Sequence, residues 1–246
     1  MTARPPGVTG QNLANYDTAA SVAAYGSARG LFPVEAELVS AFMPGPPASL
    51  LDLGCGAGRT TVEFDRMGYA VVGIDLSEAL IAHARAHHPA IDFRIMDATA
   101  LAWPDASFDA AIFSYNGIDC LYPVEARETC LREVARVLRP GGVFILSSHN
   151  AIGAIWSGGY FYPRGYLNAL RWLGQQAGNR LIGQWYWRYV DAGGAQLLYS
   201  APPSRTVAQA RAAGFEVLAV RGASGQSAPG RVARREQHVY FVLRRP

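Results

Sequence analysis

The sequence predicts an α/β protein with an open, mostly parallel sheet that carries helices on both faces. Three observations lead to this prediction. Short apolar runs alternate with amphipathic segments from residue 48 to residue 150, which is the pattern of strand–helix–strand crossover units. A glycine-rich turn follows the first apolar run, at the edge where such sheets bind ligands. The chain has 246 residues, of which 50% are hydrophobic and 17% charged, and this suffices for one sizeable core.

The elements follow one another in a regular order. Residues 1–15 are rich in Pro, Gly and polar residues and are expected to be loose, and residues 17–43 are expected to be helical. Strands are predicted at residues 48–53, 70–75, 92–97, 108–114, 143–148, 216–222 and 236–245. Helices are predicted at residues 59–67, 77–88, 124–138 and 203–215. Residues 150–200 are rich in Gly, Trp and Tyr and show only weak periodicity, so no element is predicted there.

Composition excludes several classes of protein. The net charge of +3 comes without a basic stripe, which argues against a nucleic-acid partner. All 22 basic residues are arginine, so neither a lysine Schiff base nor a Walker phosphate loop is possible. No apolar run reaches membrane-spanning length, and we expect no membrane partner. The cysteines Cys55, Cys120 and Cys130 lack metal-ligand spacing and read as free thiols, which favours a cytoplasmic protein.

The stretch LLDLGCGAGRTT (50–61) contains the strongest motif of the chain. Gly54, Gly56 and Gly58 follow the strand that contains Asp52, and a helix follows them. Residues without a Cβ let the backbone approach a ligand or take positive φ, and the helix N-terminus offers free N–H groups. The spacing G-x-G-x-G is one residue shorter than the dinucleotide fingerprint. The alternative is that these glycines form only a tight turn.

Two further carboxylates end the next two strands. Asp75 is placed to accept from two vicinal ribose hydroxyls, and the alternative is an N-terminal cap for the helix that follows. Asp97 follows the apolar Ile95 and Met96, which suits an adenine whose amine donates while its faces stack; the alternative is a solvated turn. Acidic residues therefore end three consecutive strands, which predicts a nucleoside site at this edge of the sheet.

Together these motifs resemble those of the class I S-adenosylmethionine (SAM) methyltransferases. LLDLGCGAGRTT is similar to their first motif and VVGIDLS (71–77) to their second. RIMDATALAWPDASFDAAIF (94–113) resembles the adenine-binding segment and the strand after it. LREVARVLRPGGVFILSSHN (131–150) resembles the helix, turn and strand that close the core. The resemblance covers residues 46–150 and, more loosely, residues 203–245.

The resemblance implies a Rossmann-like, doubly wound, seven-stranded sheet of order 3-2-1-4-5-7-6 with the last strand antiparallel. It implies a single domain, residues 1–246, with four parts. These are an N-terminal helical cap (1–46), a SAM-binding core (47–150), an aromatic-rich insert that covers the substrate (151–200) and the C-terminal part of the sheet (201–246).

The cofactor implied by the resemblance is SAM, which leaves as S-adenosyl-L-homocysteine (SAH). In this assignment Asp52 faces the amino group of the cofactor, Asp75 holds the ribose hydroxyls and Asp97 accepts from the adenine amine. The implied cofactor-binding residues are Asp52, Gly54, Cys55, Gly56, Gly58, Asp75, Leu76, Met96, Asp97, Ala98 and Ser114, with Tyr25 and Arg29 from the cap.

His149 is the candidate general base, because it follows the fifth strand at the same edge of the sheet and its ordinary pKa suits base work near neutrality. The alternative is a loop histidine that hydrogen-bonds the backbone. Candidate substrate-binding residues are Tyr115, Asn116, Asp119, Trp185 and Tyr186. The alternatives are a simple turn after the fourth strand and a packing or dimer surface for the aromatic residues. No acidic cluster suggests a metal ion, so none is expected.

The sequence therefore predicts methyl transfer from SAM to a small-molecule acceptor, at oxygen or nitrogen rather than carbon. The segment YNGID (115–119) lacks the Asn/Asp-Pro-Pro-Tyr signature of enzymes that methylate nucleic-acid amines. Two alternatives stay open. One is a nicotinamide-dependent oxidoreductase, which the short glycine spacing disfavours, and the other is a non-catalytic module that binds SAM. Neither the acceptor nor the oligomeric state follows from the sequence.

Overall fold

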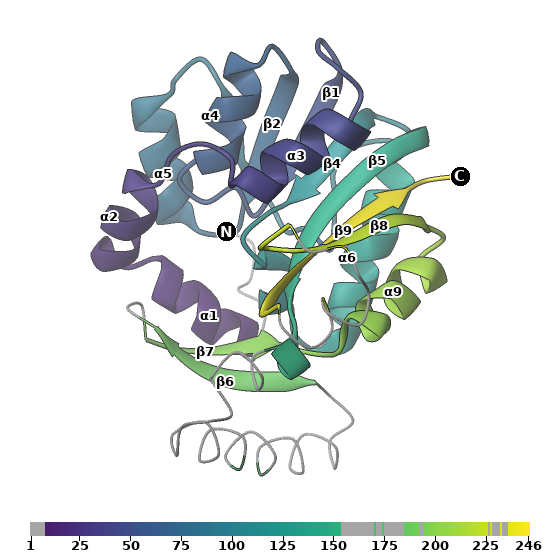
Figure 1. Cartoon of the computed structure of the whole chain (residues 1–246). Helices are drawn as coiled ribbons and strands as arrows, with labels where there is room; N and C mark the ends of the chain where they lie inside the picture. The colour runs from purple at the N-terminus through teal and green to yellow at the C-terminus, as the bar shows by residue number, and fades with distance from the viewer. Residues whose placement is uncertain are drawn as a thin grey trace.

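A seven-stranded sheet forms the centre of the molecule (Figure 1). The computed structural model describes residues 8–153, 170, 174, 185–191, 194–225, 227, 232 and 236–246. The strand order is β3-β2-β1-β4-β5-β9-β8. Neighbouring strands from β3 to β5 are parallel, and β9 is antiparallel to both β5 and β8. The bounds are β1 Ser49–Leu53, β2 Ala70–Asp75, β3 Asp92–Ile95, β4 Phe108–Phe113, β5 Leu138–His149, β8 Glu216–Gly222 and β9 His238–Arg244. The predicted order and antiparallel last strand are confirmed.

Helices cover both faces of the sheet, as its alternating side chains require. Leu50 packs with the apolar side chains of α3, whereas its neighbour Leu51 packs with those of α6 and α9. Successive strand residues point to opposite faces, so two hydrophobic cores lie on either side of one sheet. The helix bounds are α3 Pro33–Phe42, α4 Arg59–Arg66, α5 Glu78–His87, α6 Val124–Val137 and α9 Pro203–Ala212. No helix in the described ranges is long and apolar enough to cross a membrane.

The N-terminal region departs from its prediction. Residues 8–15 were predicted to be loose but belong to α1 (Val8–Tyr16), so this part of the prediction was wrong. The region 17–43, predicted to be helical, contains α2 (Ala19–Ser27) and α3 with a break between them. Thr18 separates the first two helices, because its hydroxyl accepts from the backbone N–H of Ser21 and caps α2. Helix α1 is held by tertiary contacts: the side-chain amide of Asn12 donates to the carbonyl of Leu197 and accepts from its N–H.

A two-stranded hairpin, β6 (Tyr186–Asp191) and β7 (Gly194–Tyr199), lies apart from the main sheet. The sequence did not predict it. Figure 1 shows α1 lying along β7, so an N-terminal helix packs on a hairpin from the last quarter of the chain. Most of the aromatic-rich segment 159–184 lies outside the described residues, and so do the side chains of Trp187 and Tyr189.

Candidate functional site

A cavity lies at the carboxyl ends of strands β1 to β4. Its volume is about 650 Å³, within the range of roughly 300–1,000 Å³ that is usual for small-molecule sites. The loops that follow the four strands line one part of it. Helices α1 and α2, the short helix η1 (Gly117–Cys120) and strand β7 line the rest. The cavity is thus bounded by the sheet edge, by α2 and by three elements that the sequence did not predict, namely α1, η1 and β7.

The glycine motif forms part of the cavity wall. Gly54, Gly56 and Gly58 have φ values of +60°, +55° and +91°, a region that disfavours other residues. A Cβ on Gly54 would lie 2.4 Å from the ring of Phe113, so this glycine is also required by packing. Gly54 and Gly56 line the cavity with Cys55, whereas Gly58 lies behind it, at the start of α4. The motif therefore serves both a tight turn and a bare ligand-facing surface.

Asp75 lines the cavity at the end of β2. Its two carboxylate oxygens accept from the backbone N–H groups of Gly56 and Ser77, each at 2.9 Å. Burial raises the pKa of Asp75, and the hydrogen bonds from Ser77, Gly56 and Leu76 oppose that rise. The two carboxylate oxygens have four lone pairs for these donors, so acceptor capacity remains for a ligand. The carboxylate is therefore held in a fixed orientation with acceptor capacity left over.

Apolar side chains flank Asp75. Leu76, Met96 and Ala98 all line the cavity. The side chain of Asp97 does not line it; its Oδ1 accepts from the backbone N–H and the hydroxyl of Thr99, both at 2.8 Å. The structure therefore places the neighbours of Asp97 in the cavity wall and Asp97 itself in a local turn. Its role toward an adenine stays a prediction.

Asp52 has no exposed surface and does not line the cavity. Its Oδ2 accepts from the hydroxyls of Thr60 and Thr61 at 2.6 and 2.7 Å. Its Oδ1 is buried and has no hydrogen-bond partner among the described residues. Thr60 does line the cavity, so any influence of Asp52 on a ligand passes through this hydroxyl. The prediction that Asp52 faces the amino group of the cofactor, directly or through water, stays a prediction.

Asp52 predicts a specific pH dependence of stability. Burial raises its pKa from 3.8 to about 6, although Thr60 and Thr61 donate to it. The folded state therefore favours the protonated carboxyl group of Asp52. The stabilisation that depends on this protonated form is lost as the pH rises from about 4 through about 6. The difference between these two pKa values corresponds to a loss of about 3 kcal/mol in unfolding free energy, because one pKa unit equals about 1.36 kcal/mol. We expect the difference in unfolding free energy between the parent and Asp52→Asn to fall by this amount between pH 4 and pH 7. Urea denaturation measures it, and parallel stability curves would contradict the prediction.

A buried ion pair that the sequence analysis missed lies beside the glycine loop. Glu35 of α3 is fully buried and accepts from both terminal nitrogens of Arg59, at 3.0 and 3.2 Å. Arg59 also donates to the carbonyl of Gly30 and to the hydroxyl of Ser114, and it lines the cavity. The hydroxyl of Ser114 contacts Glu35 as well. This cluster joins the helical cap to the ends of β1 and β4.

The cap contributes aromatic side chains and a second arginine. The ring of Tyr25 packs edge-on against Tyr115, with 6.2 Å between centroids, and Phe32 stacks on Tyr115 at 5.7 Å. Tyr115 is 58% exposed and has a φ of +52°. Arg29 donates to the carbonyls of Gly26 and Ala28. Tyr25, Arg29 and Tyr115 all line the cavity.

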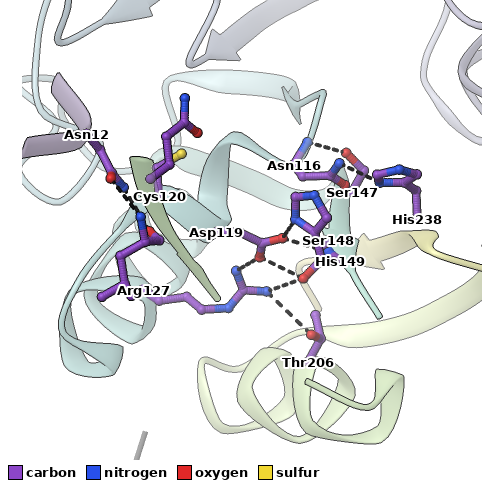
Figure 2. A network of polar contacts seen from close by, with 12 residues as sticks. Asn12, Asn116, Asp119, Cys120, Arg127, Ser147, Ser148, His149, Thr206 and His238 are labelled. Atoms are coloured by element: carbon purple, nitrogen blue, oxygen red, sulfur yellow. Dashed lines mark hydrogen bonds and ion pairs between the residues drawn. The ribbon is translucent and has the colours of Figure 1, made fainter. Parts of the chain in front are cut away.

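A second buried ion pair joins Asp119 of η1 to Arg127 of α6 (Figure 2). Asp119 and Arg127 are both fully buried, with 2.5 Å between Oδ1 and Nη1. Asp119 also accepts from the hydroxyl of Ser148 at 2.7 Å and from the backbone N–H of His149 at 2.6 Å. A carboxylate with this burial cannot contact a bound substrate. The prediction that Asp119 binds substrate is corrected on this ground: the side chain is an internal anchor.

His149 takes its orientation from Asp119. Its Nδ1 lies 2.8 Å from Oδ2 of Asp119, and its side chain is 28% exposed. Because a carboxylate only accepts, Nδ1 of the neutral ring carries the proton and Nε2 carries the lone pair. His149 does not line the cavity, but Gly117 and Cys120 of η1 do. Asp119 therefore holds the His149 ring in a fixed orientation, and the role of His149 as a general base stays a prediction.

His238 and Asn116 complete this cluster (Figure 2). The rings of His149 and His238 lie 5.0 Å apart, and the side-chain amide of Asn116 lies 2.8 Å from Nδ1 of His238. Burial and the neighbouring His149 lower the pKa of His238. Asn116 is 8% exposed and does not line the cavity. Its predicted contact with substrate stays a prediction.

The two aromatic candidates of the insert lie outside the cavity wall. Tyr186 is 2% exposed, and its hydroxyl donates to the carbonyl of Leu121. It packs on Tyr122 with 4.9 Å between ring centroids. Tyr186 therefore supports Leu121, which lines the cavity, and its predicted contact with substrate is corrected. Trp185 lies beside Arg205, with 5.8 Å between the guanidinium and the ring, and its role stays a prediction.

Residues 51–146 match the methyltransferase domain family. They include β1 to β4, the glycine loop and the carboxylates at the cavity. This match, together with the sheet topology, supports a class I SAM-dependent methyltransferase. The sheet order and the antiparallel last strand agree with this assignment.

Curated relatives support the family. A probable S-adenosylmethionine-dependent methyltransferase of Mycolicibacterium smegmatis is 37% identical over 103 residues, which are 42% of this chain and 38% of that protein. The ubiquinone biosynthesis O-methyltransferase of Xanthomonas axonopodis is 34% identical over 132 residues, which are 52% of this chain and 54% of that protein. The chain thus spans about half, or less, of the length of these relatives.

Solved structures share the fold. The CcbJ methyltransferase of Streptomyces caelestis has a TM-score of 0.66 at 17% identity, covering 94% of this chain and 98% of that chain. The [4+2]-cyclase SpnF has a TM-score of 0.62 at 19% identity, covering 98% of this chain and 97% of that chain. These likenesses extend the methyltransferase fold to residues outside the family match.

SAM is the cofactor of this family, and the cavity fits it. The free lone pairs of Asp75 suit two vicinal hydroxyls, and the apolar walls from Leu76 and Met96 suit a nucleobase. Arg29, at the cavity wall, supplies a cation for a carboxylate. The unpartnered Oδ1 of Asp52, behind Thr60, adds negative charge beneath the glycine loop. These residues of the methyltransferase would hold the cofactor.

Proposed function

We propose that this chain transfers the methyl group of SAM to a hydroxyl or an amine of a small-molecule acceptor. The observation that carries the proposal is one continuous cavity lined both by Asp75 and by α1, η1 and β7. Its volume of about 650 Å³ suits a nucleoside with a small acceptor. When bound, SAM supplies an activated methyl group. The residues of the chain then have to align the acceptor and exclude water.

His149 is the proposed general base. Its Nε2 receives the proton of the acceptor hydroxyl, while Asp119 holds the ring through Nδ1 and stabilises the charged imidazole. In this role the acceptor extends from the cavity past Gly117 toward His149. Asp119 is a positioning residue, because Arg127 and Ser148 saturate its other lone pairs.

The sequence and the relatives both support a small molecule as the methyl acceptor. The relatives include a ubiquinone biosynthesis O-methyltransferase and a demethylmenaquinone methyltransferase, and these names indicate small-molecule substrates. The chain also lacks a basic stripe, so nucleic acid is not proposed as a substrate. The family match disfavours the alternative function, a nicotinamide-dependent oxidoreductase. The three cysteines are free, in keeping with the proposed cytoplasmic location.

Asp75→Ala tests the cofactor site. We expect this variant to bind SAM and SAH at least tenfold more weakly, because it loses the fixed carboxylate that accepts from the ribose. Isothermal titration calorimetry measures both affinities. Asp105→Ala is the matched control, since the Asp105 side chain is 72% exposed and should leave the affinities within twofold. Unchanged binding in Asp75→Ala would remove this residue from the cofactor site.

Methyl transfer itself is tested with SAM labelled in its methyl group. The assay offers neutral phenols, carboxylates and amines as acceptors, with an oligonucleotide as the comparison. Label in a small molecule supports the proposal. If SAH binds but no acceptor is labelled, the chain is a non-catalytic SAM-binding module. If neither SAM nor SAH binds, the proposed function fails altogether.

A further inference from the structure

One end of the cavity is built from α1, η1 and β7. We call it the cap end, and it comprises Asn12, Leu13, Tyr16, Cys120, Leu121 and Gln196. The charged side chains among the described lining residues are Arg29, Arg59 and Asp75, and none belongs to the cap end. The cap end therefore offers neutral hydrogen-bonding groups on an otherwise apolar wall.

The polar groups of the cap end form an ordered chain. The hydroxyl of Tyr16 donates to Oε1 of Gln196 at 3.2 Å and lies 3.5 Å from the sulfur of Cys120. Burial raises the pKa of the Cys120 thiol to about 12, and it raises the pKa of Tyr16 as well. Both groups are therefore uncharged at neutral pH. Because Tyr16 occupies Oε1, it fixes which way the Gln196 amide faces.

The amide nitrogen of Gln196 is left without a partner. Gln196 is 4% exposed, yet its Nε2 donates to no group in the described part of the chain. This nitrogen is not one of the fully buried atoms without a partner in the described part of the chain, so it stays accessible from the cavity. Since Gln196 lines the cavity, a bound molecule is positioned to supply the missing acceptor atom.

We infer that Gln196 is the specificity-determining residue of the acceptor site and selects a neutral molecule that carries a carbonyl group. The inference rests on the proposed function and names its acceptor class. The Nε2–H group donates to the carbonyl oxygen, while Leu13 and Leu121 contact the apolar body of the acceptor. A carbonyl oxygen only accepts, which matches the free N–H of the Gln196 amide. A carboxylate or an ammonium group would lose its hydration here without an opposite charge.

Three probes separate these requirements: acetophenone, ethylbenzene without the oxygen, and benzoate with a charge. Protein labelled with ¹⁵N in glutamine is titrated with each probe, with and without saturating SAH, and the side-chain amide signal of Gln196 is followed by NMR. We expect acetophenone to shift this signal saturably and ethylbenzene to leave it in place. Benzoate should bind about tenfold more weakly than acetophenone or not at all. Absence of acetophenone binding, or binding that leaves the Gln196 signal unmoved, overturns the inference.

Variants give an independent measurement. Gln196→Leu keeps most of the side-chain volume and removes the donor, so acetophenone should bind about tenfold more weakly while ethylbenzene binds as well as before. Gln237→Leu, at an exposed position, is the matched control. Equal acetophenone affinity in Gln196→Leu overturns the inference. The NMR titration of the parent protein decides the question if this variant does not fold. Failure of SAH to bind would instead count against the proposed function, since the probes are also titrated without it.

Discussion

Replacing Arg127 by methionine is expected to lower the free energy of unfolding by about 3–5 kcal/mol. Arg127 and Asp119 have no exposed side-chain surface, so the variant leaves the Asp119 carboxylate buried without its cation. The guanidinium also donates to Gln209 and lies 4.5 Å from the centroid of the Tyr199 ring, so the variant loses packing as well. Urea denaturation followed by circular dichroism measures the change.

The control is an arginine in an exposed ion pair. Arg244 pairs with Glu216 at 2.6 Å, but the two side chains are 47% and 50% exposed. Arg244→Met should therefore cost no more than about 1 kcal/mol, because solvent and salt screen such pairs. A loss in Arg127→Met no greater than in Arg244→Met would show that the buried pair is not a main source of stability.

His149→Gln should reduce kcat for methyl transfer to a hydroxyl acceptor by about 10²–10⁴-fold, the usual contribution of a general base. Glutamine retains a donor toward Asp119 but has no group that takes up a proton. The acid limb of the pH–rate profile should disappear in the variant, which a purely structural role would not cause. Steady-state kinetics over a range of pH measure both effects.

Asp119→Asn is the companion variant for the positioning role. The amide is a poor partner for the charged imidazole, so kcat should fall while KM for SAM stays close to that of the parent. His83→Gln is the control, because His83 lies on α5 and does not line the cavity. If His149→Gln keeps kcat within threefold of the parent, His149 is not the base.

The sheet was predictable because its signals are local. Each strand is a short apolar run between turn residues, and Gly54, Gly56 and Gly58 mark a turn that needs positive φ. The positions of Asp75 and Met96 at the cavity followed from the rule that parallel strands present their carboxyl ends at one edge. These features depend on neighbours in the sequence or on a general property of the fold.

The rest depends on contacts between distant residues. Nothing near Gln196 in the sequence indicates that Tyr16 fixes its amide, since 180 positions separate the two residues. Glu35 and Arg59 likewise meet only in three dimensions. Arg127 did carry a signal: it lies three and seven positions before Cys130 and Val134, on the buried stripe of α6. A charge on an apolar helical stripe indicates a buried partner, and the sequence analysis did not use it.

The pairing of Asn12 with Leu197 has a consequence for synthesis of the chain. The two residues are 185 positions apart, so α1 has no partner on β7 until most of the polypeptide has left the ribosome. The glycine loop and strands β1 to β4 are all encoded before residue 114. Because long-range contacts form late, the nucleotide side of the pocket can assemble on a nascent chain whose acceptor side does not yet exist.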